Sequence, residues 1–302
     1  MGKQIILTEV GPRDGFHNES KILDTATKVA LIEASIEAGF KEIEFGYFTN
    51  LEKAPSLADV EMVYEKIKHH KEVKLKALIE DAEGLSRAVD AGVKQVKMSV
   101  SASNTYNMKK FNMTNEEKLR AIEKLVQEAM SKKIQISCAV STSFGCPYEG
   151  KMTPSKIDTI ASRLVEMGIQ EIYISDTAGM GNPAEAENIF GFFLDKYPDR
   201  LFSAHFHDTR GMGLANVYAA IKVGVRRFDS SFGGLGGCPY VPGGKGNVSS
   251  EDLIHMLEEM GYQTGIDLDK AIQIGKKLET IFEKPMNSYV LEAGKSSELI
   301  RT

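Results

Sequence analysis

The sequence predicts an α/β protein that folds as an eight-unit (β/α)8, or TIM, barrel with a short C-terminal helical extension. Three observations support this prediction. The 302 residues accommodate a barrel of ~250 residues. Helix-patterned stretches end in a glycine that precedes a strand-like run, which is typical of the junction between a helix and the next strand. Eight candidate strands alternate with helical patterns, which favours a closed barrel over an open doubly wound sheet.

The junction glycines recur with a regular spacing. They are Gly39, Gly92, Gly168 and Gly224, separated by 53, 76 and 56 residues. If the gaps span two, three and two units, each unit has about 25 to 28 residues, slightly fewer than the ~31 residues of a typical barrel unit. The spacing therefore predicts repeated units with others between them.

The eight strands and several helices are predicted in the following order. The expected strands are Gln4–Glu9, Glu42–Phe45, Lys74–Ile79, Gln95–Ser101, Gln135–Val140, Glu171–Ser175, Leu201–His205 and Arg227–Ser231. Helical patterns between them include Thr25–Ala38, Glu116–Lys132, Ser155–Met167 and Pro183–Tyr197. Thr114-x-x-Glu117 is a capping-box pattern, and Asn182-Pro183 places proline in a first helical turn. No G-x-G-x-x-G follows the first strand, which disfavours a dinucleotide-binding fold.

The C-terminal part extends beyond the eighth unit. A further helical pattern covers Leu268–Phe282, and a polar tail follows to Thr302. No low-complexity linker separates this part from the barrel. We therefore expect a catalytic barrel domain at 1–264 and a helical extension, packed on the barrel, at 265–302.

Composition excludes several classes of protein. The chain has 37 Lys and Arg against 42 Asp and Glu, a net charge of −5, which argues against a nucleic-acid-binding protein because phosphate neutralisation needs a basic surface. The apolar runs are far shorter than the ~20 residues of a membrane span. Three widely spaced cysteines and an N-terminus without a secretory pattern indicate a reducing compartment, so we expect a cytoplasmic protein.

Polar residues collect where the predicted strands end. In a barrel of this kind, function lies at the C-terminal ends of the strands and in the loops that follow them. These positions hold Arg13, Asp14, Glu44, Asp176, His205, His207, and the glycine-rich stretch from Gly233 to Asn247. We therefore expect one polar site at this end of the barrel.

His205-x-His207 is a candidate metal-binding pair. Alternate residues of a strand point to the same face, so both imidazoles can approach one ion. Asp14 and Asn247 would add oxygen ligands from the neighbouring first strand and eighth-strand loop. Two nitrogens and two oxygens without a thiolate favour Mg²⁺ or Mn²⁺ over structural Zn²⁺. The alternative is a hydrogen-bonded pair inside the barrel that binds no metal.

Arg13 and the two acidic residues each allow two interpretations. Arg13 beside Asp14 is either an exposed ion pair or, because Pro12 and Gly15 enclose it in a tight turn, a guanidinium aimed at a developing negative charge. Glu44 and Asp176 could each act as a base or support Arg13 or a ligand histidine, and we favour the supporting role.

The stretch Gly233–Asn247 contains seven glycines in fifteen residues. So many glycines are entropically costly unless the loop moves or approaches a ligand closely. Cys238 within it is either a thiol that transfers a proton or an inert small residue. Cys138 is expected in the core and Cys146 in a structural position. The pair Lys109–Lys110 is either a solvated turn or a contact for a coenzyme A phosphate.

Taken together, these motifs resemble the DRE-type TIM-barrel metallolyases, and among them the 3-hydroxy-3-methylglutaryl-CoA lyases. The resemblance is carried by Glu9–Gly15, Gly145–Lys151, His205–Thr209, the Gly233–Asn247 loop and Glu251–Leu253. It implies metal ligation by Asp14, His205, His207 and Asn247. It further implies catalysis by Arg13, Glu44 and Cys238, with Asp176 in the polar network.

The resemblance implies a retro-Claisen cleavage that yields acetyl-CoA and acetoacetate, as in leucine degradation. The partner is an acyl-CoA substrate, and a homodimer is compatible with the family. The chain departs from the family pattern at Phe45-Gly46-Tyr47 and at His17, near the expected acyl group. A lyase for another 3-hydroxyacyl-CoA, a synthase that condenses acetyl-CoA with a 2-oxo acid, and a non-catalytic barrel are the alternatives.

Overall fold

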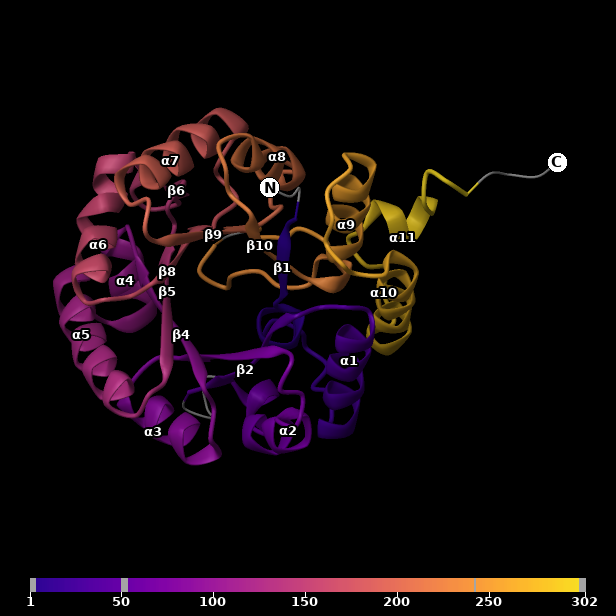
Figure 1. Cartoon of the computed structure of the whole chain (residues 1–302), viewed down its shortest axis with the longest axis horizontal. Coiled ribbons are helices and arrows are strands. Elements are labelled where there is room, and N and C mark those ends of the chain that lie inside the picture. The colour runs from indigo at the N-terminus through magenta and orange to yellow at the C-terminus, as the bar shows by residue number, and fades with distance from the viewer. Residues whose placement is uncertain (1–3, 50–53, 242, 299–302) are drawn as a thin grey trace.

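Eight parallel strands close into a barrel with the helices arranged around its outside (Figure 1). The structure is a computed structural model that describes residues 4–49, 54–241 and 243–298. Around the barrel the strands follow the order β1-β10-β9-β8-β5-β4-β3-β2. All of these neighbouring pairs are parallel, and β10 closes the barrel against β1. The predicted (β/α)8 barrel is confirmed.

Each predicted strand corresponds to a strand of the barrel. The barrel strands are β1 (Ile6–Glu9), β2 (Glu42–Phe48), β3 (Lys74–Ile79), β4 (Gln95–Ser101), β5 (Gln135–Ser141), β8 (Glu171–Asp176), β9 (Leu201–Phe206) and β10 (Arg227–Ser230). The two-residue strands β6 (Gly145–Cys146) and β7 (Gly150–Lys151) form a separate antiparallel ribbon. Strand β2 continues to Phe48, beyond the predicted end at Phe45, and its register with β3 shifts between Glu44 and Gly46. Pairing resumes after this irregularity, so Tyr47 lies within the strand.

The helices begin largely where polar capping residues predict them. They are α1 (Thr25–Glu37), α2 (Val60–Ile67), α3 (Ala82–Ala91), α4 (Asn104–Phe111), α5 (Asn115–Ser131), α6 (Pro154–Glu166), α7 (Pro183–Lys196), α8 (Gly213–Lys222), α9 (Ser250–Glu259), α10 (Leu268–Phe282) and α11 (Tyr289–Ala293). The capping box of Thr114 is confirmed, and Asn182 forms a second one. The pair Lys109–Lys110 lies in the last turn of α4, so the alternative of a non-helical solvated turn is not what the structure has there.

The four junction glycines have the backbone conformation that their sequence positions predict. Gly39, Gly92, Gly168 and Gly224 all have positive φ, between +87° and +115°. Glycine adopts this conformation without steric cost, which lets the chain leave a helix and enter the next strand. The strands that follow bury β-branched and aromatic side chains in the core between the barrel and its helices.

The barrel interior is charged near the N-terminal ends of the strands. Glu42 accepts hydrogen bonds from Lys76 at 2.7 Å and from Arg227 at 2.6 Å. Lys76 also contacts Glu171 and donates to the hydroxyl of Tyr173 at 2.7 Å. Burial opposes ionisation of Glu42, but Lys76 and Arg227 outweigh it and lower its pKa to about 2. The network is therefore a set of compensated charges.

Helices α10 and α11 lie beside α1 and α9 on the outside of the barrel (Figure 1). The backbone N–H of Asp267 donates to the carbonyl of Ala38 at 2.7 Å, at the end of α1. Residues 299–302 of the expected extension lie outside the described residues. Within the part of the chain that the structure describes, no helix is long and apolar enough to cross a membrane.

Candidate active site

A cavity of about 300 Å³ opens at the C-terminal ends of the barrel strands. Its wall includes Arg13 and Asp14 after β1, His205 from β9 with His207 just after it, and Cys238 from the glycine-rich loop. These residues come from opposite ends of the sequence. They meet because β1 lies next to β10 and β10 next to β9 in the closed barrel.

Asp14, His205 and His207 form a buried cluster that could hold a metal ion. One potential ligand atom from each lies within 4.8 Å of the others. The two imidazole rings are 5.0 Å apart between centroids. Asp14 lies in the short helical turn η1 (Gly11–Gly15). An isolated antiparallel bridge between His207 and Asn247 brings the loop residue to the same place.

Two buried atoms of this cluster lack hydrogen-bond partners among the described residues. They are Nδ1 of His207 and the amide oxygen of Asn247. The Asn247 amide nitrogen donates to Asp14 Oδ2 at 2.7 Å and to the Leu235 carbonyl at 2.9 Å. Buried polar atoms are rarely left unpaired, and a cation is one partner that would satisfy both. The donor set therefore fits a divalent ion.

Gly236 makes the approach of the loop to this cluster possible. Its φ is +123°, and a Cβ atom there would lie 2.4 Å from the Asn247 amide nitrogen and 2.8 Å from Asp14 Oδ2. No other residue type would fit without moving these side chains. This observation gives one of the seven glycines of the loop a definite role.

The electrostatics of the cluster keep Asp14 ionised and His207 neutral. Burial opposes the charge of Asp14, but Arg13 and the neighbouring imidazoles outweigh it and hold the pKa of Asp14 well below its usual range. Burial also lowers the pKa of His207. An anionic carboxylate and a neutral imidazole are the protonation states in which these groups bind metals.

Arg13 is held by two carboxylates. Its Nε donates to Glu44, and its Nη1 donates to Asp14 Oδ1 at 2.5 Å. Glu44 itself is fully buried in β2 and does not line the cavity. Glu44 therefore orients the Arg13 guanidinium from behind the cavity wall.

Asp176 faces the backbone of its own loop. It lies at the end of β8, fully buried, and accepts hydrogen bonds from the N–H groups of Met180 and Gly181, both at 2.9 Å. Burial raises its pKa. Asp176 is absent from the cavity wall, so its contacts brace the loop after β8.

Cys238 lies at the cavity wall, within reach of a buried tyrosine. The Tyr106 hydroxyl is 2.9 Å from Cys238 Sγ. A second tyrosine, Tyr148, donates to the carbonyl of Tyr240 at 2.7 Å. These two contacts hold the glycine-rich loop over the cavity. Cys138 is buried in the core, as predicted, and Cys146 is buried as well.

Lys97, Asp229 and Tyr106 also border this site, although none of them belongs to a predicted motif. Lys97 interrupts the buried strand Gln95–Ser101, and Asp229 interrupts Arg227–Ser230. Strands of a parallel barrel are buried on both faces, so a charged residue within one signals an interior polar network. Tyr106 has no such signal, because an aromatic residue in a helix is usually part of the core.

A closed barrel with a carboxylate, two imidazoles and an oriented guanidinium at its C-terminal end defines a TIM-barrel enzyme with a candidate metal site. Similarity to known proteins identifies the family of this enzyme. The HMGL-like family model matches residues 4–278, and the chain belongs to this family. The resemblance predicted from the motifs is therefore confirmed.

Several relatives and solved structures similar to this chain are hydroxymethylglutaryl-CoA lyases. This chain is 36% identical over 295 residues, covering 98% of this chain and 99% of the relative, to the hydroxymethylglutaryl-CoA lyase YngG of Bacillus subtilis. The hydroxymethylglutaryl-CoA lyase of Pseudomonas mevalonii is 37% identical, with 89% and 90% covered. An HMG-CoA lyase of Acinetobacter baumannii, solved in complex with coenzyme A and 3-methylmalate, superimposes with a TM-score of 0.95 at 37% identity, covering 99% and 98% of the two chains.

Proposed function

We propose that this chain cleaves 3-hydroxy-3-methylglutaryl-CoA to acetyl-CoA and acetoacetate with the help of a divalent cation. The observation that carries the proposal is the buried Asp14, His205 and His207 cluster beside Arg13, in a chain that belongs to the HMGL-like family. The curated relatives that support the substrate are hydroxymethylglutaryl-CoA lyases over nearly their full length.

Asp14, His205, His207 and Asn247 are the residues that we propose to hold the cation. Mg²⁺ or Mn²⁺ suits two imidazoles and two oxygens that leave room for substrate oxygens. When bound, the cation would polarise the substrate oxygens and lower the pKa of the substrate hydroxyl. Asp14 is poised for this role because its pKa is already held low.

Arg13 and Cys238 are the residues that we propose to act on the reacting atoms. When a base takes the proton of the substrate hydroxyl, the C2–C3 bond breaks, its electron pair becomes the enolate of acetyl-CoA, and the hydroxyl carbon becomes the ketone of acetoacetate. The fixed Arg13 guanidinium would stabilise that negative charge. Cys238 would protonate the enolate carbon, with the loop held over the cavity by Tyr106 and Tyr148. Glu44 orients Arg13, and Asp176 braces its loop.

A second candidate substrate is another 3-hydroxyacyl-CoA. Tyr47 and His17 both line the cavity, with their rings 6.2 Å apart between centroids. The Tyr47 hydroxyl donates to Glu80 at 2.8 Å. These larger side chains stand where the acyl group is expected, so a substrate with a different acyl group is the favoured alternative. Lys110 also lines the cavity and could contact an anionic group of such a substrate.

The test is direct. Purified protein is incubated with 3-hydroxy-3-methylglutaryl-CoA and Mg²⁺ or Mn²⁺, and acetoacetate and acetyl-CoA are measured by chromatography. We expect equimolar products that disappear with EDTA. Cleavage of another 3-hydroxyacyl-CoA at a much higher kcat/KM would reassign the substrate. Release of free thiol from acetyl-CoA and a 2-oxo acid, without any cleavage, would replace the lyase by a synthase.

Two further properties belong to the proposal. A cytoplasmic location is supported by three free cysteines, which suit a reducing compartment. A homodimer is compatible with the family, and light scattering of the purified protein would test it: a monomer at micromolar concentration would contradict it.

A further inference from the structure

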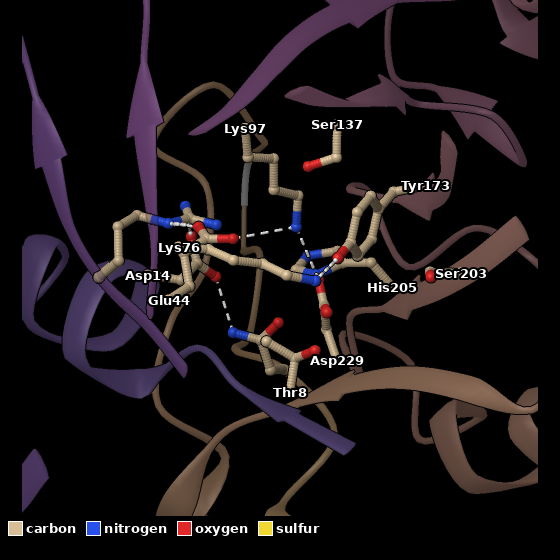
Figure 2. A network of polar contacts seen from close by, with 12 residues as sticks. Thr8, Asp14, Glu44, Lys76, Lys97, Ser137, Tyr173, Ser203, His205 and Asp229 are labelled. Atoms are coloured by element: carbon tan, nitrogen blue, oxygen red, sulfur yellow. Dashed lines mark hydrogen bonds and ion pairs between the residues drawn. The ribbon is translucent and has the colours of Figure 1, made fainter. Parts of the chain in front are cut away.

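Lys97 lies in the barrel interior and forms part of the wall of the candidate active-site cavity. It belongs to β4, and its side chain is only 3% exposed. Its ammonium group contacts Glu44 Oε2 at 3.1 Å and Asp229 Oδ2 at 2.9 Å. It also lies 3.6 Å from the centroid of the Tyr173 ring. Figure 2 shows the Lys97 ammonium group between Glu44 and Asp229, with a contact to each carboxylate.

The two carboxylates that contact Lys97 each orient a different group of the site. Glu44 accepts a hydrogen bond from Nε of Arg13. Asp229 Oδ2 is 3.0 Å from Nδ1 of His205, the carboxylate–histidine contact that commonly fixes a metal-ligating imidazole. Lys97 is therefore the shared partner of the guanidinium side and the imidazole side of the site.

The charges make this position more than a packing contact. Around the site, the cations Arg13 and Lys97 face the anions Asp14, Glu44 and Asp229, so one negative charge remains on the side where a cation would bind. Without Lys97, Glu44 and Asp229 would be two buried carboxylates sharing one compensating guanidinium. Buried charges that lose their partner are strongly disfavoured, so both side chains would leave their present positions.

We infer that Lys97 is a positioning residue that aligns Arg13 through Glu44 and His205 through Asp229, so that one side chain sets both halves of the site. The inference rests on the proposed function, since it assigns Arg13 and His205 the roles given there. Among the described residues, the Lys97 ammonium group contacts Glu44, Asp229 and Tyr173 rather than the proposed metal ligands or Arg13. Lys97 would therefore act on the site through its carboxylate partners.

The chain offers a matched control. Lys76 in β3 is also 3% exposed, and it also contacts two carboxylates, Glu42 and Glu171. Its ammonium group lies 5.5 Å from the same Tyr173 ring. Within the part of the chain that the structure describes, neither carboxylate partner of Lys76 forms a hydrogen bond or ion pair with Arg13 or His205. Lys76→Met thus removes an equivalent buried charge without reaching the site.

The experiment compares Lys97→Met and Lys76→Met with the wild-type protein. Mn²⁺ affinity is measured by isothermal titration calorimetry, thermal unfolding by circular dichroism, and kcat and KM by acetoacetate release at saturating Mn²⁺. For Lys97→Met we expect Mn²⁺ affinity to fall by ~10- to 100-fold, as for lost partners of metal ligands. We expect kcat to fall by ~100-fold because Arg13 is displaced, with a smaller change in KM. Lys76→Met should lower the unfolding temperature by about as much as Lys97→Met does, because each removes one buried charge. It should change Mn²⁺ affinity by less than about 3-fold.

A double-mutant test asks whether Lys97 acts through Asp229. In the Asp229→Asn background, Lys97→Met should change Mn²⁺ affinity by less than about 3-fold, because the coupling is already lost. A full additional loss in that background would overturn the inference. If Lys97→Met does not fold, Lys97→Gln, which keeps a hydrogen-bond donor but no charge, takes its place with the same expectations.

The outcomes separate this inference from the proposed function. Equal effects of Lys97→Met and Lys76→Met on Mn²⁺ affinity and kcat would reduce Lys97 to a structural residue and overturn the inference. A wild-type protein that binds Mn²⁺ but does not cleave the thioester substrate would refute the proposed substrate, and the Mn²⁺ comparison would still decide the role of Lys97. A wild-type protein that binds no Mn²⁺ would refute both.

Discussion

Replacing Arg13 by lysine tests whether the guanidinium acts as an oriented fork or only as a positive charge. In the structure, Nε donates to Glu44 and Nη1 to Asp14, which leaves the second terminal nitrogen available to the cavity. The side chain is 13% exposed, so water does not replace these contacts. A lysine has a single nitrogen and cannot hold both carboxylates while facing the substrate.

The expected loss follows from the donor that Arg13→Lys removes. Losing one fixed donor to a developing oxyanion lowers kcat by ~10²- to 10³-fold, about 2.7–4 kcal/mol of transition-state stabilisation. The binding of the substrate in its ground state should weaken less, because the lysine ammonium group still attracts an anionic substrate. We therefore expect kcat to fall by at least about 100-fold, and KM to rise only modestly.

The assay is acetoacetate release under single-turnover and steady-state conditions, with Mn²⁺ affinity measured in parallel. Arg210→Lys is the matched control, since Arg210 lies at the same end of the barrel but, among the described residues, its hydrogen bonds go to the carbonyls of Ala178 and Gly179. This control should remain close to wild type. If Arg13→Lys keeps kcat within about 3-fold of wild type, the oriented donor is not a source of catalysis, and the role assigned to Arg13 is wrong.

Three further predictions concern the metal cluster, the loop and the buried acids. Asp14→Asn removes the anionic oxygen of the donor set, so calorimetry should show Mn²⁺ affinity at least ~10-fold weaker; unchanged affinity would remove Asp14 from the proposed ligands. Tyr106→Phe deletes the contact with Cys238 Sγ, a hydrogen bond worth ~0.5–1.5 kcal/mol. Alkylation of Cys238, the one cysteine that is not fully buried, should therefore accelerate by ~2- to 10-fold. An unchanged alkylation rate would show that Tyr106 does not hold the thiol. Burial raises the pKa of Glu9 to about 8 and of Glu251 to about 7, whereas an unfolded glutamate titrates near ~4.3. The folded protein therefore holds extra protons between these values. The contribution of the two glutamates to the free energy of unfolding should be fully present below about pH 4 and fall towards pH 8. Urea titrations should show a weaker decline over this range for Glu9→Gln, and an identical decline would contradict the assignment.

Local patterns predicted the regular elements well. The helix α10 spans Leu268–Phe282 as expected, and the Thr114 capping box is present. Strand β2 was predicted too short, and its irregularity after Glu44 arises from pairing with β3. Pairing between strands is set by the neighbouring chain segment, so no pattern within Glu42–Phe48 itself announces it.

The candidate site was only partly predictable for the same reason. Asp14, His205, His207 and Asn247 could be selected as one group because they follow strands that end at the same face of a barrel. The direction of a side chain is another matter. Glu44 and Asp176 also follow that rule, yet one contacts Arg13 behind the cavity wall and the other the backbone of its loop.

The sequence by itself determined the order of the eight units, the strand ends and therefore the residues that share one end of the barrel, since these depend on local periodicity and capping. Only the tertiary structure decided which of those side chains touch. The contact between Lys97 and Asp229 joins residues 132 positions apart, and closure of the barrel brings β4 and β10 around one interior. Such contacts depend on strand stagger and side-chain direction across the whole barrel, which no segment of the sequence carries alone.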